Sequence, residues 1–126
     1  LEMTFGGAEV NVAVALAQLG GSAAFVTRLP DNEIARACLA RIRAAGVDVS
    51  GVLRGGERIG AYYVERGGGA RSASVTYDRK GSAIATVDPD SLDWNTLLAG
   101  AGALHISGIT PALSDAAATA ARQGME

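Results

Sequence analysis

Hydrophobic and polar residues follow two different periods along this chain, which predicts both helices and strands. Apolar residues recur at helical spacing in two early segments, one directly after Gly6-Gly7 and one over residues 33–45. Between them, residues 23–27 form a short apolar run of strand length. The second helix is expected to begin after Asn32, because an asparagine side chain can accept a hydrogen bond from a first-turn N–H group.

The middle of the chain has the pattern of a β-hairpin. Residues 59–65 and 72–78 are predicted to form two strands, joined by a flexible turn of glycines at 67–69. Apolar and polar residues alternate along the second strand, as they do in a sheet with one polar face. A strand of this kind differs from the apolar runs elsewhere, so we expect the hairpin to be an appendage to the core.

The last part of the chain returns to helices and buried strands. A helix is predicted from Asp88 to about residue 101, a buried strand at 103–107, and a further helix capped by Ser114. We interpret three acidic residues near the start of the first of these helices as carboxylates that complement its dipole, namely Asp88, Asp90 and Asp93.

Alternating helices and strands predict a parallel sheet with helices packed on it, so the expected fold class is α/β. Residues 1–53 and 84–126 would form one core, interrupted by a small β lid at 54–83. The chain begins at Leu1 and ends at Glu126 within a helical pattern, so we expect it to be part of a longer protein.

Composition narrows the class of protein. Hydrophobic residues make up 48% of the 126 residues, which is typical of a globular chain and not of a disordered one. The net charge of −2 is spread along the sequence, so we expect no nucleic-acid surface and no polybasic membrane anchor. No apolar run approaches the roughly 18 residues of a membrane span. The single cysteine, Cys38, is interpreted as a core thiol, and a reducing, cytoplasmic location is expected.

The strongest candidate for chemistry is the start of the first helix, Gly6-Gly7-Ala8-Glu9-Val10-Asn11. Paired glycines let a ligand approach the backbone, and a helix N-terminus offers free N–H groups. Asn11 adds donors and an acceptor suited to hydroxyl groups. The alternative is that the glycines only make a turn and Asn11 is a solvated helix residue.

A second candidate lies on the hairpin. Tyr62 and Tyr77 bring amphipathic rings to the two strands, and Arg79 follows the second strand directly. A sugar acid requires an apolar surface for its C–H face and a planar cation for its carboxylate. The alternative is that both tyrosines are packing residues and Arg79 is one arginine among several.

Other residues carry weaker signals. His105 has no metal-binding partner at a suitable spacing and is interpreted as a buried core histidine, so no metal site is predicted. Ser107-Gly108 follows a predicted strand end and could either line a cleft or make a turn. The glycine motifs that bind nucleotide phosphates are absent.

Taken in order, these segments resemble the ribokinase-like (PfkB) carbohydrate kinases. Residues 6–48 are similar to the family's first signature, a glycine pair and asparagine followed by helix, strand and a helix ending in AAGVD. Three later segments look most like 2-keto-3-deoxygluconate kinases: residues 59–63, TYDRKGSA at 76–83 and LHISGITPALS at 104–114. The resemblance covers nearly the whole chain and implies a three-layer α/β sandwich, incomplete here, with a β-hairpin lid.

The resemblance also implies which residues border the substrate. From the first helix these are Gly7, Ala8, Glu9, Val10 and Asn11, and from the lid Tyr62, Tyr77, Asp78 and Arg79. The subfamily often has an aromatic residue where this chain has Asp78. The family's catalytic aspartate lies in a Gly-Ala-Gly-Asp motif toward the C-terminus, which this sequence lacks, so no catalytic residue is expected here.

The implied activity of the complete protein is transfer of the ATP γ-phosphoryl group to 2-keto-3-deoxygluconate, with Mg²⁺, while the chain alone is expected to be inactive. The alternatives are a fructokinase- or ribokinase-type enzyme of the same family and a non-catalytic sugar-binding domain of the same fold. A two-stranded ribbon is marginal in water unless its apolar face is covered, so a homodimer through the lid is expected.

Overall fold

The structure is a computed structural model that describes residues 2–69 and 72–126. In chain order its elements are α1 (Ala8–Gln18), β1 (Thr27–Leu29), α2 (Glu33–Ala44), β2 (Val52–Arg54), β3 (Ala61–Glu65), β4 (Ser74–Asp78), 3-10 turns at Ile84–Thr86 and Pro89–Ser91, α3 (Trp94–Leu97) and α4 (Asp115–Met125). In the part of the chain described, no helix combines the length and the apolar character needed to cross a bilayer.

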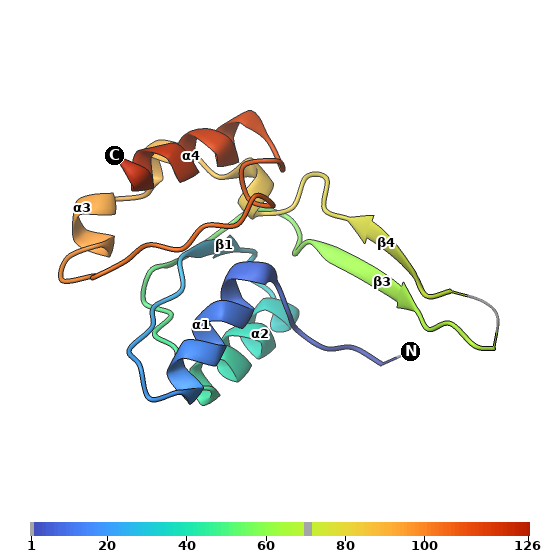
Figure 1. Cartoon of the computed structure of the whole chain (residues 1–126). Coiled ribbons are helices and arrows are strands. Elements are labelled where there is room, and N and C mark those ends of the chain that lie inside the picture. Colours follow the sequence, from blue (N-terminus) through green and yellow to red (C-terminus); the bar gives the residue numbers. More distant parts are fainter. Residues whose placement is uncertain (1, 70–71) are drawn as a thin grey trace.

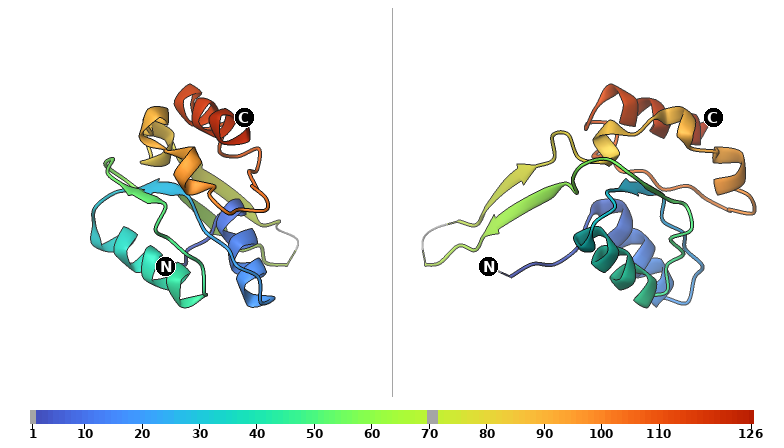
Figure 2. Two further views of the ribbon diagram at one scale, coloured as in Figure 1. Left: turned by 90° about the vertical axis from the view of Figure 1, so that its left-hand side faces the viewer. Right: turned by 180° about the vertical axis from the view of Figure 1, so that it is seen from behind.

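The core has helices on both sides of a short parallel ribbon. β1 pairs with β2 in parallel, with Thr27 opposite Val52. Helices α1 and α2 lie on one side of this ribbon, and α3 and α4 lie on the other (Figures 1 and 2). The result is the layered α/β arrangement that the alternation of helices and strands predicts.

Apolar side chains on the two faces of the ribbon form two separate clusters. The first lies under α1 and α2 and includes Leu29 and Val52. The second lies under α3 and α4 and includes Val26 and Leu53. Neighbouring residues such as Val52 and Leu53 serve opposite clusters because successive side chains of a strand point to opposite faces.

Helix α2 forms where the sequence predicts it. The Asn32 side chain accepts a hydrogen bond of 2.9 Å from the Ala35 N–H group and so caps the helix. One face of the helix is buried, including Cys38 and Ile42. The core interpretation of Cys38 is confirmed, and burial raises the pKa of its thiol.

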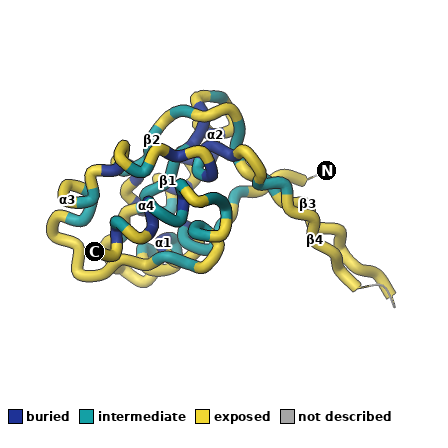
Figure 3. Tube along the Cα trace, turned by 90° about the horizontal axis from the view of Figure 1, so that it is seen from above, coloured by how far each residue is buried: buried dark blue, intermediate teal, exposed yellow. Residues whose placement is uncertain are grey.

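The predicted hairpin is present and projects from the core (Figures 1 and 3). β3 and β4 pair antiparallel, with Tyr62 opposite Tyr77 and Val64 opposite Val75. These four side chains share one face of the ribbon because residues two apart in a strand point the same way. All four remain exposed, so the hairpin keeps an uncovered apolar face.

Two predictions about the early strands need correction. The strand predicted at residues 23–27 is displaced: only an isolated bridge joins Ala24 to Asp48, and the ladder itself runs over Thr27–Leu29. Its partner, β2, was not predicted. Both differences arise from parallel pairing between segments about 25 residues apart, since such pairing sets where a ladder forms independently of local hydrophobicity.

The long helix predicted from Asp88 is wrong. Asp88 and Asp93 each accept a hydrogen bond from a nearby backbone N–H group, and each therefore starts its own short turn. The helix-start role proposed for these two carboxylates is confirmed. Asp90 lies in the first turn of the Pro89–Ser91 element, as predicted, and it also accepts a hydrogen bond from the Gln123 side chain.

The strand predicted at residues 103–107 is also wrong. The segment belongs to no ladder in the described chain, and His105 is exposed rather than buried. A parallel strand is buried only when strands or helices cover it on both sides. Within residues 2–69 and 72–126, no strand pairs with this segment.

Candidate functional site

The start of α1 and one face of the hairpin line one open hollow. Its volume is about 140 Å³, and its lining comes from Gly7, Ala8, Asn11, Tyr62, Tyr77 and Arg79. Two candidate groups of the sequence, more than 50 residues apart, therefore meet in space. A shared binding site requires such a convergence of residues from separate parts of the chain.

The α1 side of the hollow is a helix N-terminus without a side-chain cap. Gly7 occupies the cap position and supplies no side-chain hydrogen bond, in contrast to Asn32 of α2 and Ser114 of α4. The first-turn N–H groups of α1 therefore have no capping side chain and can receive a ligand oxygen. Asn11 follows one turn later, with its own N–H group donating to the Gly7 carbonyl over 2.9 Å.

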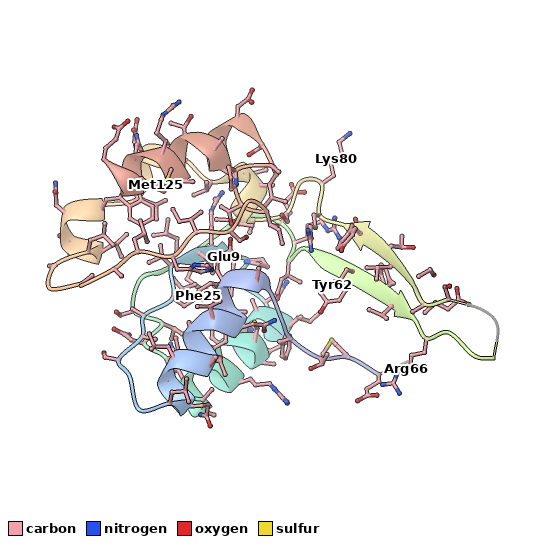
Figure 4. The ribbon with its side chains drawn as sticks, viewed as in Figure 1. Glu9, Phe25, Tyr62, Arg66, Lys80 and Met125 are labelled. Atoms are coloured by element: carbon pink, nitrogen blue, oxygen red, sulfur yellow. The ribbon has the colours of Figure 1, made fainter. Side chains whose placement is uncertain are left out.

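Glycine at position 6 allows the hairpin to approach α1. A Cβ atom there would lie 3.2 Å from the Tyr62 hydroxyl oxygen, tighter than most carbon–oxygen contacts. The Tyr62 side chain lies on the side of β3 that faces the N-terminal segment (Figure 4). A side chain at position 6 would require the Tyr62 hydroxyl to move by about a few tenths of an ångström.

The hairpin side of the hollow combines two aromatic rings with a cation. The centroids of Tyr62 and Tyr77 are 6.3 Å apart, within the range of tilted aromatic pairs. The guanidinium carbon of Arg79 lies 4.2 Å from the Tyr77 centroid, a cation–π contact that orients the guanidinium group. No carboxylate in residues 2–69 or 72–126 pairs with Arg79, so its charge is available to an anion.

Asp78 does not line the hollow. It lies on the opposite face of the hairpin from Tyr77, where both carboxylate oxygens accept hydrogen bonds from Arg58. Arg58 also donates to the backbone carbonyls of Asp78 and Lys80, over 3.2 and 3.0 Å. The Arg58–Asp78 pair thus joins the segment that enters the hairpin to the segment that leaves it. Its hydrogen bonds raise the pKa of Arg58. Arg58 was not predicted, because nothing local distinguishes it from the other arginines.

Glu9 and Val10 also lie outside the lining. Val10 is buried in the first apolar cluster. The Glu9 carboxylate accepts hydrogen bonds from Ser107 and Thr110, so the Ser107-Gly108 turn contacts α1 and does not line the hollow. Burial alone would raise the pKa of Glu9, but these hydrogen bonds outweigh it and the pKa is lowered. Thr110 was not predicted, since its contact spans 101 residues.

Comparison with known proteins decides the family. The family model of pfkB family carbohydrate kinases matches residues 1–125, which is nearly the whole chain. The chain belongs to this family.

Relatives of this pfkB-family chain include kinases of sugar acids. It is 43% identical to the 2-dehydro-3-deoxygalactonokinase of Haloferax volcanii, over 91% of the chain and 36% of that protein. It is 39% identical to the 2-dehydro-3-deoxygluconokinase of Thermoproteus tenax, over 88% of the chain and 34% of that protein. The chain thus spans about a third of the length of these relatives.

A solved structure confirms the fold of this pfkB-family chain. The 2-dehydro-3-deoxygluconokinase of Thermotoga maritima matches with a TM-score of 0.94 and 42% identity, over 98% of the chain and 38% of that structure. The ribokinase-like α/β fold expected from the sequence is therefore confirmed, as is the incomplete form of the domain.

Proposed function

We propose that the hollow binds a sugar acid, 2-keto-3-deoxygluconate (2-dehydro-3-deoxygluconate) or a close stereoisomer, as the phosphoryl acceptor of a kinase. The observation that carries this proposal is the meeting of the uncapped α1 start with Tyr62, Tyr77 and Arg79 around one hollow. The names of the similar proteins support the choice of acceptor class.

Each part of the lining has a role that follows from its chemistry. Arg79 binds the acceptor carboxylate, because a planar guanidinium can donate two parallel hydrogen bonds to it. Asn11 and the free N–H groups of α1 bind hydroxyl oxygens. The rings of Tyr62 and Tyr77 cover the apolar C–H face of the acceptor and exclude water.

Phosphoryl transfer asks a protein mainly for positioning and for stabilisation of charge. In our proposal this chain contributes the positioning of the acceptor, and the hairpin acts as a lid over it. ATP and Mg²⁺ are the expected donor and metal of the complete protein. The described residues form no group of His, Cys, Asp or Glu side chains that could hold a metal ion, and the sequence has no phosphate-binding glycine motif. We therefore assign no residue of this chain to ATP or Mg²⁺, and we expect no turnover by the chain alone.

The test compares two arginines of the hairpin region. Arg79→Ala removes the cation of the hollow, whereas Arg66→Ala removes an exposed arginine whose ion-pair partner is Glu2, 3.7 Å away. Calorimetric titration with 2-keto-3-deoxygluconate should give a dissociation constant at least about tenfold higher for Arg79→Ala, because a charge-assisted contact contributes about 1.5–3 kcal/mol. Arg66→Ala should bind like the unchanged chain.

Fructose, a neutral sugar, serves as the second ligand in the same titrations. Equal binding of the acid by Arg79→Ala and the unchanged chain would contradict the sugar-acid proposal, and tight fructose binding would favour a fructokinase-type function. Sugar-acid binding by a complete protein that never phosphorylates the acid would instead favour the non-catalytic alternative.

We also propose that the complete protein is a homodimer through its hairpins. The exposed face of Tyr62, Val64, Val75 and Tyr77 is apolar, and an isolated two-stranded ribbon is marginal in water. A second hairpin of the same shape would cover the part of this face that lies beyond the hollow, at Val64 and Val75, together with the strand edges. Solution scattering at micromolar concentration should give a dimer, and a monomer there would contradict the proposal.

A further inference from the structure

One carboxylate oxygen joins the start of α1 to a segment about 100 residues later. Oε1 of Glu9 accepts hydrogen bonds from the Ser107 hydroxyl at 2.7 Å, the Thr110 hydroxyl at 2.8 Å and the Ser107 N–H group at 3.2 Å. The Ile109 N–H group donates in turn to the Ser107 hydroxyl oxygen, at 3.2 Å. Glu9 lies at the end of α1 that meets the extended segment before α4 (Figure 4).

These contacts hold the start of α1, whose cap residue makes no side-chain hydrogen bond. A helix start is usually held by its cap residue, but Gly7 has no side chain and leaves the first turn open toward the hollow. Val10 anchors this turn by packing in the first apolar cluster, and Glu9 fastens it by hydrogen bonds to Ser107 and Thr110, without occupying the hollow. Glu9 is half-buried and in the first turn, where the helix dipole favours a negative charge.

These hydrogen bonds affect the hollow because three residues of its lining, Gly7, Ala8 and Asn11, lie within two residues of Glu9 in the chain. If the start of α1 shifted, Asn11 and the free N–H groups would move with it and would no longer face the atoms of a bound ligand. Binding sites hold their geometry when side chains outside the lining fix the elements that carry them.

We infer that Glu9 is a positioning residue: its carboxylate locks the first turn of α1 to residues 107–110 and so sets the orientation of the acceptor-binding groups. This inference rests on the proposed function of the hollow. It assigns to Glu9 an indirect role, in place of the direct substrate contact that the resemblance implies.

The experiment uses Glu9→Ala, Glu9→Gln and Ser107→Ala, with Glu33→Ala as the matched control. Glu33 is also a first-turn glutamate, on α2, and its partner is Arg36. Two quantities are measured on each variant: amide hydrogen exchange at residues 8–11 and 107–110 without ligand, and the dissociation constant for 2-keto-3-deoxygluconate.

Glu9→Ala should speed exchange in both segments and raise the dissociation constant about tenfold, as expected for loss of a charged hydrogen-bond acceptor. Glu9→Gln should stay within about threefold of the unchanged chain, because an amide oxygen can accept hydrogen bonds at the same position. The double variant Glu9→Ala with Ser107→Ala should bind no more weakly than Glu9→Ala alone, since both changes remove the same contact between Glu9 and Ser107. Glu33→Ala should alter neither quantity.

Unchanged exchange at 107–110 in Glu9→Ala would overturn the inference, and so would faster exchange with unchanged binding. Equal loss in Glu9→Gln and Glu9→Ala would show that the charge, and not the position of the acceptor, matters. If the unchanged chain does not bind the acid, the proposed function fails, and the exchange comparison alone then decides whether Glu9 fastens the two segments.

Discussion

The base of the hairpin offers a sharp test of the packing described above. Gly56 has a φ of +81°, and a Cβ atom there would lie 2.8 Å from both Cα and Cβ of Ala83. Ala83 is only 1% exposed and follows the returning strand into the core, so its backbone has little room to move. Gly56→Ala should therefore destabilise the chain at the point where hairpin and core meet.

The magnitude follows from three terms. Alanine in the left-handed region costs about 1–2 kcal/mol, and forcing a methyl group into a filled site costs about 1–3 kcal/mol. Reduced freedom of the unfolded chain offsets about 0.4–1 kcal/mol. The expected net loss in the free energy of unfolding is about 3 kcal/mol.

Gly81→Ala is the matched control. Gly81 lies in the other connection of the hairpin, with a φ of +66°, but a Cβ atom there meets nothing within 4 Å. The Gly81→Ala variant should lose only about 1 kcal/mol of its free energy of unfolding, from backbone strain alone. Urea unfolding followed by circular dichroism gives both values. Equal losses for Gly56→Ala and Gly81→Ala would refute the close contact with Ala83.

Two further predictions concern α2 and Glu9. Ile42→Ala should lower the free energy of unfolding by about 2–5 kcal/mol because the Ile42 side chain is buried. Ile34→Ala, on the exposed face of the same helix, should lower it by about 1 kcal/mol or less. Similar urea midpoints for the two variants would contradict the assigned burial. Because the folded pKa of Glu9 is lowered from its ordinary value of 4.5, its ionised carboxylate stabilises the fold above that pH, and this contribution disappears as the pH falls through the folded pKa. Urea midpoints measured on both sides of that pH should therefore fall less steeply on acidification in Glu9→Gln than in the unchanged chain, and identical slopes would contradict this role of Glu9.

Local signals were sufficient for some of the fold. Helix α2 was predicted because its cap, Asn32, and its apolar spacing lie within one short segment. The hairpin was predicted because alternation and a glycine turn are also local. β2 and the segment 103–107 were misjudged because a parallel ladder depends on a partner strand distant in the sequence.

The same distinction holds for the candidate site. The glycine–asparagine segment and the Tyr-Asp-Arg segment each suggested a ligand from its own chemistry, and the structure brings most of their residues to one hollow. The roles of Glu9 and Asp78 were harder to predict, because each is determined by a partner elsewhere in the chain: Ser107 for Glu9 and Arg58 for Asp78. Neither partner lies in a recognisable motif with the residue that it contacts.

The measurement that tests the central claim most directly is a nuclear magnetic resonance titration of the chain with 2-keto-3-deoxygluconate. We expect the largest shifts in backbone and side-chain signals from both walls of the hollow, in Gly7, Ala8, Asn11, Tyr62, Tyr77 and Arg79. Signals from the exposed face of α2, which includes Ile34, should stay unchanged. Shifts confined to one wall, or centred on any other surface, would contradict a binding site built from α1 and the hairpin together.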